Sequence, residues 1–533
     1  MKKTFKKIFL ILLSLMFVFS SSYSNILADE LPQVESATIP ITRDENSLTP
    51  FTYVTGSPGL QVMRLVYDSL ATLDLDNQVV PWMAKSIDVS DDNREFTISL
   101  SEGLKWHDGE KVTLEDVKFS FEYPSTQEQS TWKSIVKNVE ALEIVDNQLV
   151  IKLIESQPSF LIEGLAALPI IPKHIYENVE DASIFDGTVG SGMYEIIEYI
   201  PGTSYVLEAQ DDYFKGKPKI KQINMPIIND NSTIYTGLKM GEFLTFTGSL
   251  TADLLEEFSN NDNVEVITDS GLTSTLLYWN IDREPFDNVD FRKALSLAID
   301  NDTLIENIYL GFADAGLPGF YSPASPFANK DIVYESNIAQ AEELLDSIGY
   351  SEKDAEGFRL NADGHPLKFE LLTGNKAEKI RMAEIIASNL EKIGIQIEVI
   401  SYEQDTLDSY VWPDFDASKP VDYDMSIFGW SAPVMLKESM LTSLLSIPEE
   451  AGIYNLTKYR DTDYLKLEKE FLAEENIDKR ADLMKEIQVL MSKTYPFHVI
   501  AYPNIISVYN SSIYNGFKMQ KGQGIINVYS FIE

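Results

Sequence analysis

The chain has 533 residues, more than one hydrophobic core usually serves, so we expect two or three lobes. Its formal net charge of −40 at pH 7 is repelled by phosphate backbones and anionic lipid surfaces, which argues against nucleic-acid binding and against adhesion to a membrane through the protein's own surface. The chain has no cysteine, which excludes disulfides, cysteine-ligated zinc, iron–sulfur clusters and thiol nucleophiles.

The first 28 residues have the pattern of a cleavable secretory signal. Four lysines, at positions 2, 3, 6 and 7, precede an apolar run from Ile8 to Phe19 and a Ser-rich stretch. The run is shorter than the roughly 20 residues that a membrane-spanning helix needs. We expect cleavage near Ala28 and an exported protein at the cell surface, in the extracellular space or in the periplasm. The mature chain would carry no cysteine to accept a lipid.

The next part of the chain is rich in strand patterns. Residues 34–70 predict a strand, a loop and a helix, and the alternating side chains of Glu95–Leu100 predict a half-buried strand. Thr113 is expected to cap a helix, and Asp146-Asn147 is expected to turn a hairpin. Further strands are predicted at residues 194–199, 204–209, 220–228 and 273–280.

From residue 287 to residue 495, helix and strand patterns alternate. Helices are predicted from Asn288 to near Gly311 and at residues 337–348, 376–393, 462–475 and 478–493, and strands at residues 395–400 and 423–428. This alternation indicates an α/β fold with a mixed sheet covered on both faces. The final segment, residues 497–533, is again predicted to be rich in strands.

Several short motifs follow one another along the chain. They are Val66-Tyr67-Asp68-Ser69-Leu70, Val80-Pro81-Trp82-Met83-Ala84, Trp106-His107-Asp108-Gly109, Val189-Gly190-Ser191-Gly192, Phe291-Arg292-Lys293-Ala294-Leu295 and Gly429-Trp430. Together, and in this order, they resemble the family 5 extracellular solute-binding proteins of bacterial ABC importers. That family includes oligopeptide-, dipeptide- and nickel-binding proteins, and the resemblance covers nearly all of the mature chain.

The resemblance implies a two-lobe fold like that of periplasmic binding proteins of type II, in the large three-part variant. A ligand cleft would lie between the lobes, which would close by a hinge. The implied parts are lobe 1, formed by residues 34–70, 189–282 and 500–533, a β-rich insert subdomain at residues 71–188, and lobe 2 at residues 283–499. The chain is expected to cross between the lobes near residues 280–285 and 497–503.

The resemblance also implies a function. The chain, a monomer, would bind a small solute, most simply a short peptide, and deliver it to an ABC permease and ATPase complex, without a cofactor or metal. The alternatives are an oligosaccharide or a nickel chelate in the same fold, and, in another class, a secreted sensor or pheromone-binding protein that is not coupled to transport. No enzyme activity is expected, since the sequence has no Gly-x-Ser-x-Gly elbow and no His-Glu-x-x-His pair.

The Gly429-Trp430 motif marks the first group of implied site residues. In peptide-binding relatives, this Gly-Trp pair is followed after two residues by an Asp that pairs with the free amino group of the peptide. The matching positions place Trp430, Ser431 and Ala432 at the cleft, but Pro433 stands in the position of the Asp. Either another acid, such as Glu438, takes its part, or the ligand is not an ordinary free peptide.

Two loops supply the other candidates. The loop of residues 43–50 and Tyr53 after it are expected to face the cleft from lobe 1, with Glu45 as a second acid for a ligand amine. A second loop, at residues 373–376, ends a strand and opens a helix, so its backbone N–H groups can face an anion. Asn375 of this loop is a candidate ligand-binding residue. The resemblance implies that a basic residue near this position can meet a ligand carboxylate, and Lys376 or Arg381 is the candidate.

The histidines do not form a metal-ligand pattern. The chain has four, at positions 107, 174, 365 and 498, and their spacing is not that of a zinc site. His107 lies in the Trp106–Gly109 motif, which is predicted to be a structural turn because no second ligand is near it in the sequence. The sequence therefore predicts no metal site.

Overall fold

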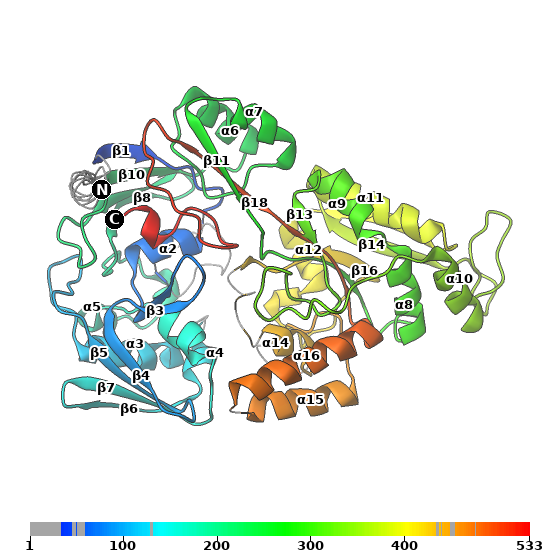
Figure 1. Ribbon diagram of the computed structural model, residues 1–533, viewed down its shortest axis with the longest axis horizontal. Helices are drawn as coiled ribbons and strands as arrows, with labels where there is room; N and C mark the ends of the chain where they lie inside the picture. Colours follow the sequence, from blue (N-terminus) through cyan, green and yellow to red (C-terminus); the bar gives the residue numbers. More distant parts are fainter. Residues whose placement is uncertain are drawn as a thin grey trace, which may run out of the picture.

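The computed structural model of the chain has two lobes that lie side by side (Figure 1). It describes residues 33–44, 49–50, 59–127, 132–432, 436, 438, 440–447, 454–474 and 476–532. The predicted signal segment, residues 1–28, lies outside the described residues. Within the described ranges, no helix is both long and apolar enough to cross a bilayer.

Lobe 1 and the insert each contain a four-stranded sheet. The lobe 1 sheet has the order β1 (Val34–Thr38), β10 (Ile220–Pro226), β9 (Ser204–Ala209) and β8 (Tyr194–Ile200), and the insert sheet has the order β4 (Ala84–Val89), β5 (Glu95–Leu100), β7 (Gln148–Leu153) and β6 (Val139–Val145). The short pair β2 (Ala71–Leu73) and β3 (Val79–Pro81) leads into the insert. The helices of this half are α2 (Gly59–Val66), α3 (Leu114–Glu122), α4 (Lys133–Val136), α5 (Lys173–Tyr176), α6 (Asn231–Met240) and α7 (Leu255–Ser259).

Lobe 2 is built on a six-stranded mixed sheet. Its order is β13 (Ala313–Ala315), β17 (His498–Pro503), β12 (Thr275–Trp279), β16 (Met425–Phe428), β14 (Lys368–Gly374) and β15 (Gln396–Tyr402). Strand β14 is parallel to both β15 and β16, so the carboxyl ends of these three strands share one edge. The helices are α8 (Val289–Ala298), α9 (Asn301–Tyr309), α10 (Ile338–Ser347), α11 (Ala377–Glu391), α12 (Gln404–Val411), α14 (Met440–Leu445), α15 (Thr462–Ala473) and α16 (Ile477–Thr494).

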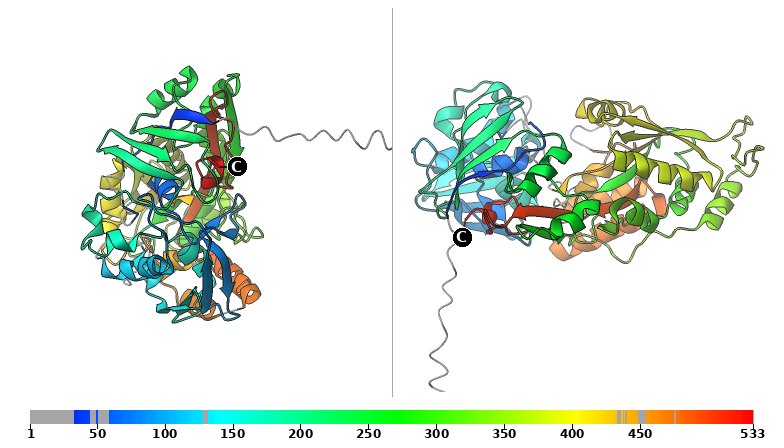
Figure 2. Two further views of the ribbon diagram at one scale, coloured as in Figure 1. Left: turned by 90° about the vertical axis from the view of Figure 1, so that its left-hand side faces the viewer. Right: turned by 90° about the horizontal axis from the view of Figure 1, so that it is seen from above.

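The chain crosses between the lobes in two segments that lie side by side. On the lobe 1 side, β11 (Val264–Asp269) pairs antiparallel with β18 (Ile505–Asn510), and on the lobe 2 side β12 pairs antiparallel with β17. The crossings are therefore residues 270–274 and Asn504, and the view from above in Figure 2 shows the C-terminal strands running between the lobes. At Gly271 a side chain would not fit, since a Cβ atom would lie 1.8 Å from the carbonyl oxygen of Pro503.

These crossings lead us to propose lobe boundaries that differ from the predicted ones. A crossing is expected near residues 280–285. These residues follow β12, which is an inner strand of the lobe 2 sheet, so the chain has already entered lobe 2 before it reaches them. The physical reason is that a strand pattern does not reveal its partner strand, and β12 pairs with strands more than 100 residues away in sequence. We therefore propose that lobe 2 runs from residue 275 to residue 503 and lobe 1 resumes at residue 505; for the insert we keep residues 71–188.

The hydrophobic cores show which parts are joined rigidly. One core contains Phe96 and Ile151 of the insert together with Tyr194 and Ile220 of lobe 1. Lobe 2 has two cores of its own, on the two faces of its sheet. Because the insert shares a core with lobe 1, the two form one body, and the predicted hinge lies between that body and lobe 2.

The predicted secondary structure is largely confirmed. Thr113 caps α3 in a capping box with Asp116, and Asn288 and Asn337 cap α8 and α10. The helix expected from Asn288 to Gly311 is two helices, because Asp300 caps a second one, α9. After Asn510 the described chain forms no further strand of a sheet, so the strand prediction for the last residues is wrong there.

Candidate functional site

A cavity of about 280 Å³ lies between the two lobes. Lobe 1 and the insert form most of its wall, with aromatic side chains at Tyr67, Trp82, Trp132 and Phe246. The far wall comes from lobe 2 and includes Ser431, Ala432 and Leu436. A concave site with mainly apolar walls and a few polar groups is the usual form of a small-molecule site.

The lobe 2 wall of the cavity is formed by residues that directly follow β16. At Gly429 a Cβ atom would lie 2.1 Å from the carbonyl oxygen of Ser274, so this close approach requires glycine. The backbone N–H of Trp430 donates to the Ser274 hydroxyl (3.0 Å), and the Ser274 N–H donates to the Trp430 carbonyl (2.9 Å). These contacts tie residues 429–432 to the first crossing segment, so the wall is fixed close to the hinge.

Trp430 itself stands behind that wall. Its side chain is 7% exposed, and its indole N–H donates to the hydroxyl of Tyr278 (2.8 Å). The rings of Trp412 and Tyr454 lie 5.4 and 5.0 Å from it, centre to centre. Trp430 is not among the residues that line the cavity, whereas its neighbours Ser431 and Ala432 are.

The other predicted residues are placed apart from the cavity or lie outside the described ranges. Glu45, Tyr53 and Pro433 belong to residues that the structure does not describe. Glu438 is engaged within lobe 2, where it accepts a hydrogen bond from the guanidinium of Arg480 on α16 at 2.9 Å.

The three candidates at and after the loop of residues 373–376 also lie away from the cavity. Asn375 donates to the carboxylate of Glu403 (2.5 Å), and Lys376 is exposed at the N-cap of α11. Arg381 lies in a separate, open hollow beside Thr303 of α9. Asn375 and Lys376 follow β14 at the sheet edge that also carries Gly429, and Arg381 lies in α11; the structure brings none of the three to this cavity.

Sequence reasoning missed the polar residues that do line the cavity. They lie in and just after α2 and include Gln61, Arg64 and Asp68. A weak signal was present in the sequence, because Asp68 is an acid that directly follows the apolar run Leu65-Val66-Tyr67. Buried acids usually have partners or functions, so such a residue marks a candidate site.

Asp68 is held firmly in the cavity wall. The residue is 3% exposed, and its Oδ1 atom accepts hydrogen bonds from the indole N–H of Trp82 (2.9 Å) and the hydroxyl of Tyr213 (2.9 Å). Burial raises the pKa of its carboxyl to about 7, against the lowering effect of these two donors and of the Lys215 ammonium. This carboxyl therefore changes charge near neutral pH.

The motifs of the chain meet beside Asp68. The N–H of Gly192 donates to the carbonyl of Val66 at the end of α2 (2.8 Å), and His107 exchanges backbone and ring hydrogen bonds with Gly190. The His107 ring accepts from the Gly190 N–H at Nδ1 and so donates from Nε2 to the Gly192 carbonyl (3.0 Å). Burial lowers the pKa of His107, which keeps the ring neutral. The predicted structural role of this motif is confirmed.

The other buried histidine is also structural. His498 contacts the hydroxyl of Ser296 (2.7 Å) and the amide oxygen of Asn301 (3.0 Å), and burial lowers its pKa to about 3. Over the described ranges, no three His, Asp or Glu side chains gather in a way that could hold a metal ion.

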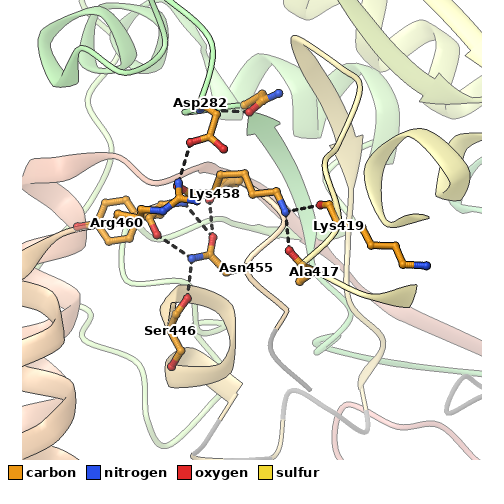
Figure 3. A network of polar contacts seen from close by, with 10 residues as sticks. Asp282, Ala417, Lys419, Ser446, Asn455, Lys458 and Arg460 are labelled. Atoms are coloured by element: carbon orange, nitrogen blue, oxygen red, sulfur yellow. Dashed lines mark hydrogen bonds and ion pairs between the residues drawn. The ribbon is translucent and has the colours of Figure 1, made fainter. Parts of the chain in front are cut away.

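A polar network in lobe 2 is centred on Lys458 and Asn455 (Figure 3). The buried ammonium of Lys458 donates to the backbone carbonyls of Ala417 and Lys419, and the amide of Asn455 donates to the carbonyls of Ser446 and Tyr459. The network fixes the segment that begins at Tyr454, whose ring packs on Trp430. It therefore holds the aromatic cluster behind Ser431 and Ala432.

Lys458→Met is expected to lower the free energy of unfolding by about 2 kcal/mol or more, because one buried and one partly buried carbonyl lose a charged donor. Calorimetry of the purified variant measures the loss. Asp282→Asn is the matched control, since it removes an exposed ion pair with Arg460 in the same network and is expected to cost less than about 1 kcal/mol. Equal losses in the two variants would contradict a special role for the buried ammonium.

Two lobes, two adjacent crossing segments and a cavity between the lobes define a solute-binding protein that closes around its ligand. Residues 78–450 match the family model of the bacterial extracellular solute-binding proteins, family 5, and the chain belongs to this family. The predicted fold and family are thereby confirmed.

Individual relatives agree with this assignment. The chain is 26% identical over 482 residues to the oligopeptide-binding protein AppA of Bacillus subtilis (strain 168), and the match covers 85% of this chain and 83% of that protein. The structure of AppA from Bacillus subtilis in complex with a nonapeptide matches with a TM-score of 0.79 at 23% identity, over 94% of this chain and 99% of that chain. The structure of NikZ from Campylobacter jejuni in complex with Ni(L-His) matches with a TM-score of 0.78 at 22% identity, over 94% and 99% of the two chains.

Proposed function

We propose that this protein is the extracytoplasmic receptor of an ABC importer and binds a short peptide in the cavity between its lobes. The observation that carries the proposal is the wall chemistry: Arg64 and Asp68 bring one positive and one acidic side chain to a cavity with aromatic walls. A peptide has a charge of each sign at its ends and an apolar or polar body between them. The relationship to an oligopeptide-binding protein supports the same ligand class.

The rest of the functional proposal follows from the family. The protein would act outside the cytoplasm as a monomer, after removal of the signal at residues 1–28, and its closed form would dock on a permease and ATPase complex. It would catalyse no reaction. Ser431 and Ala432 would contact the ligand, and Trp430 would support them from behind. Glu45 and Tyr53 stay candidates for the lobe 1 side of the cleft.

A panel of ligands tests the proposal by thermal shift. Di- to octapeptides are expected to raise the melting temperature, since a ligand at about a hundredfold excess over its dissociation constant stabilises the native state by about 2.7 kcal/mol. Oligosaccharides and nickel–histidine serve as the competing ligand classes. A shift with one of these alone would replace the peptide by that ligand. No shift with any peptide would contradict the proposed function.

A further inference from the structure

Two acceptor atoms at the cavity lack a donor. They are Oδ2 of Asp68 and Oε1 of Gln61, both buried and both without a hydrogen-bond partner among the described residues. Both residues line the cavity between the lobes. A buried acceptor without a donor costs free energy, and a buried carboxylate oxygen costs more than an amide oxygen. Two such atoms at one cavity indicate a donor that arrives with the ligand.

Of the two carboxyl oxygens of Asp68, Oδ2 is the one that can accept a hydrogen bond from the ligand. Oδ1 is held by Trp82 and Tyr213, whose own polar atoms lie 3.0 Å apart. The Trp82 ring is fixed in turn by Tyr529, 5.6 Å away in an edge-on contact, and by the ammonium of Lys215, 4.9 Å from its centre. The carboxyl cannot turn without losing both donors. Its second oxygen is therefore set in place before any ligand binds.

The charges of the cavity favour a cationic donor. A neutral N–H or O–H would complete the hydrogen bond of Oδ2 but would add no positive charge to the one that the Lys215 ammonium already brings to bear on the buried carboxylate. The basic side chain at this cavity, Arg64, donates to the amide oxygen of Gln523 (3.3 Å). A protonated amine supplies both the hydrogen bond and the charge that Asp68 needs.

We propose that Asp68, with the amide oxygen of Gln61, forms the subsite that receives a protonated amino group of the ligand. This inference rests on the proposed function and narrows it to solutes with a free amine. It also accounts for Pro433, which stands where relatives are expected to have their amine-binding acid. The amine is then bound by the lobe 1 wall.

A competition experiment tests the subsite. The purified protein is incubated with a synthetic library of tri- to pentapeptides mixed with an equal amount of the same library N-acetylated, and the retained peptides are measured by mass spectrometry. The wild type is expected to retain the free-amine forms at least tenfold over the acetylated forms. Asp68→Asn is expected to lose this preference, and Gln61→Leu to reduce it. Asp212→Asn, which removes an exposed acid paired with Lys105, is expected to keep it.

The outcomes separate the inference from the proposed function. Peptides retained by the wild type without preference for a free amine would overturn the inference alone, as would an unchanged preference in Asp68→Asn. Retention of no peptide by the wild type would overturn the proposed function and the inference together. Thermal melts of each variant establish that it is folded. If Asp68→Asn does not fold, the reduced preference for free amines in Gln61→Leu tests the subsite instead.

Discussion

Gly190→Ala is expected to lower the free energy of unfolding by about 3 kcal/mol or more, because a Cβ atom there would lie 2.1 Å from the carbonyl oxygen of Val66. Neither partner can yield easily. The Gly190 carbonyl accepts from the His107 N–H (2.9 Å), and the Val66 carbonyl accepts from the Gly192 N–H (2.8 Å). Scanning calorimetry measures the loss, and at roughly 1 °C per kcal/mol for a chain of this length the melting temperature should fall by about 3 °C or more.

A second glycine provides the control for that experiment. Gly202, in the turn between β8 and β9, has φ +69°, and a Cβ atom there would meet no other atom within 4 Å, so Gly202→Ala is expected to cost only the strain of a left-handed residue, about 1 kcal/mol. Gly190→Ala should also weaken ligand binding, because Val66 leads directly into Asp68. A loss at position 190 no larger than that at position 202 would show that the α2 end can move freely.

Local patterns predict most of the secondary structure because the signals are local. A capping side chain such as Thr113 or Asn337 satisfies N–H groups within its own first turn. The residues Asp146 and Asn147 both adopt positive φ, as the predicted hairpin turn requires. The boundary between the lobes is not local: β12 lies in lobe 2 because of its pairing with β16 and β17, which no pattern within residues 275–279 reveals.

The site is less predictable from the sequence than the fold, because its residues depend on contacts with distant parts of the chain. The Gly-Trp motif predicts Ser431 and Ala432 at the cleft, and the structure brings them to the cavity. The motif does not show that Trp430 turns back into the cluster of Trp412 and Tyr454. In the sequence Asp68 is only part of a family motif, since its functional character comes from burial and from donors such as Tyr213, which lies far along the chain.

Asp68→Asn is expected to stabilise the empty protein at pH 8 by up to about 4 kcal/mol, because it removes a buried charge. The folded-state pKa of Asp68 is raised from 3.8 to about 7, so between these values the native state holds a proton that the unfolded state has released. The wild type therefore loses stability as the pH rises through this window, and asparagine does not. The advantage of the variant should grow by about 3 kcal/mol between pH 5 and pH 8.

The titratable partner of Asp68 does not change this pH dependence of the stability difference. Burial raises the pKa of Tyr213, which donates to this carboxyl, well above its usual value, so Tyr213 does not titrate in this range. Calorimetry of the empty proteins at pH 5 and pH 8 measures the change, with Asp212→Asn as control. The pKa of Asp212 is lowered by Lys105, so Asp212→Asn should not raise the stability at either pH.

A pH-independent difference in stability between Asp68→Asn and the wild type would mean that the Asp68 carboxyl does not titrate between pH 5 and pH 8. If Asp68→Asn is more stable than the wild type and also loses its preference for free amines, then Asp68 serves ligand binding and lowers the stability of the protein without ligand.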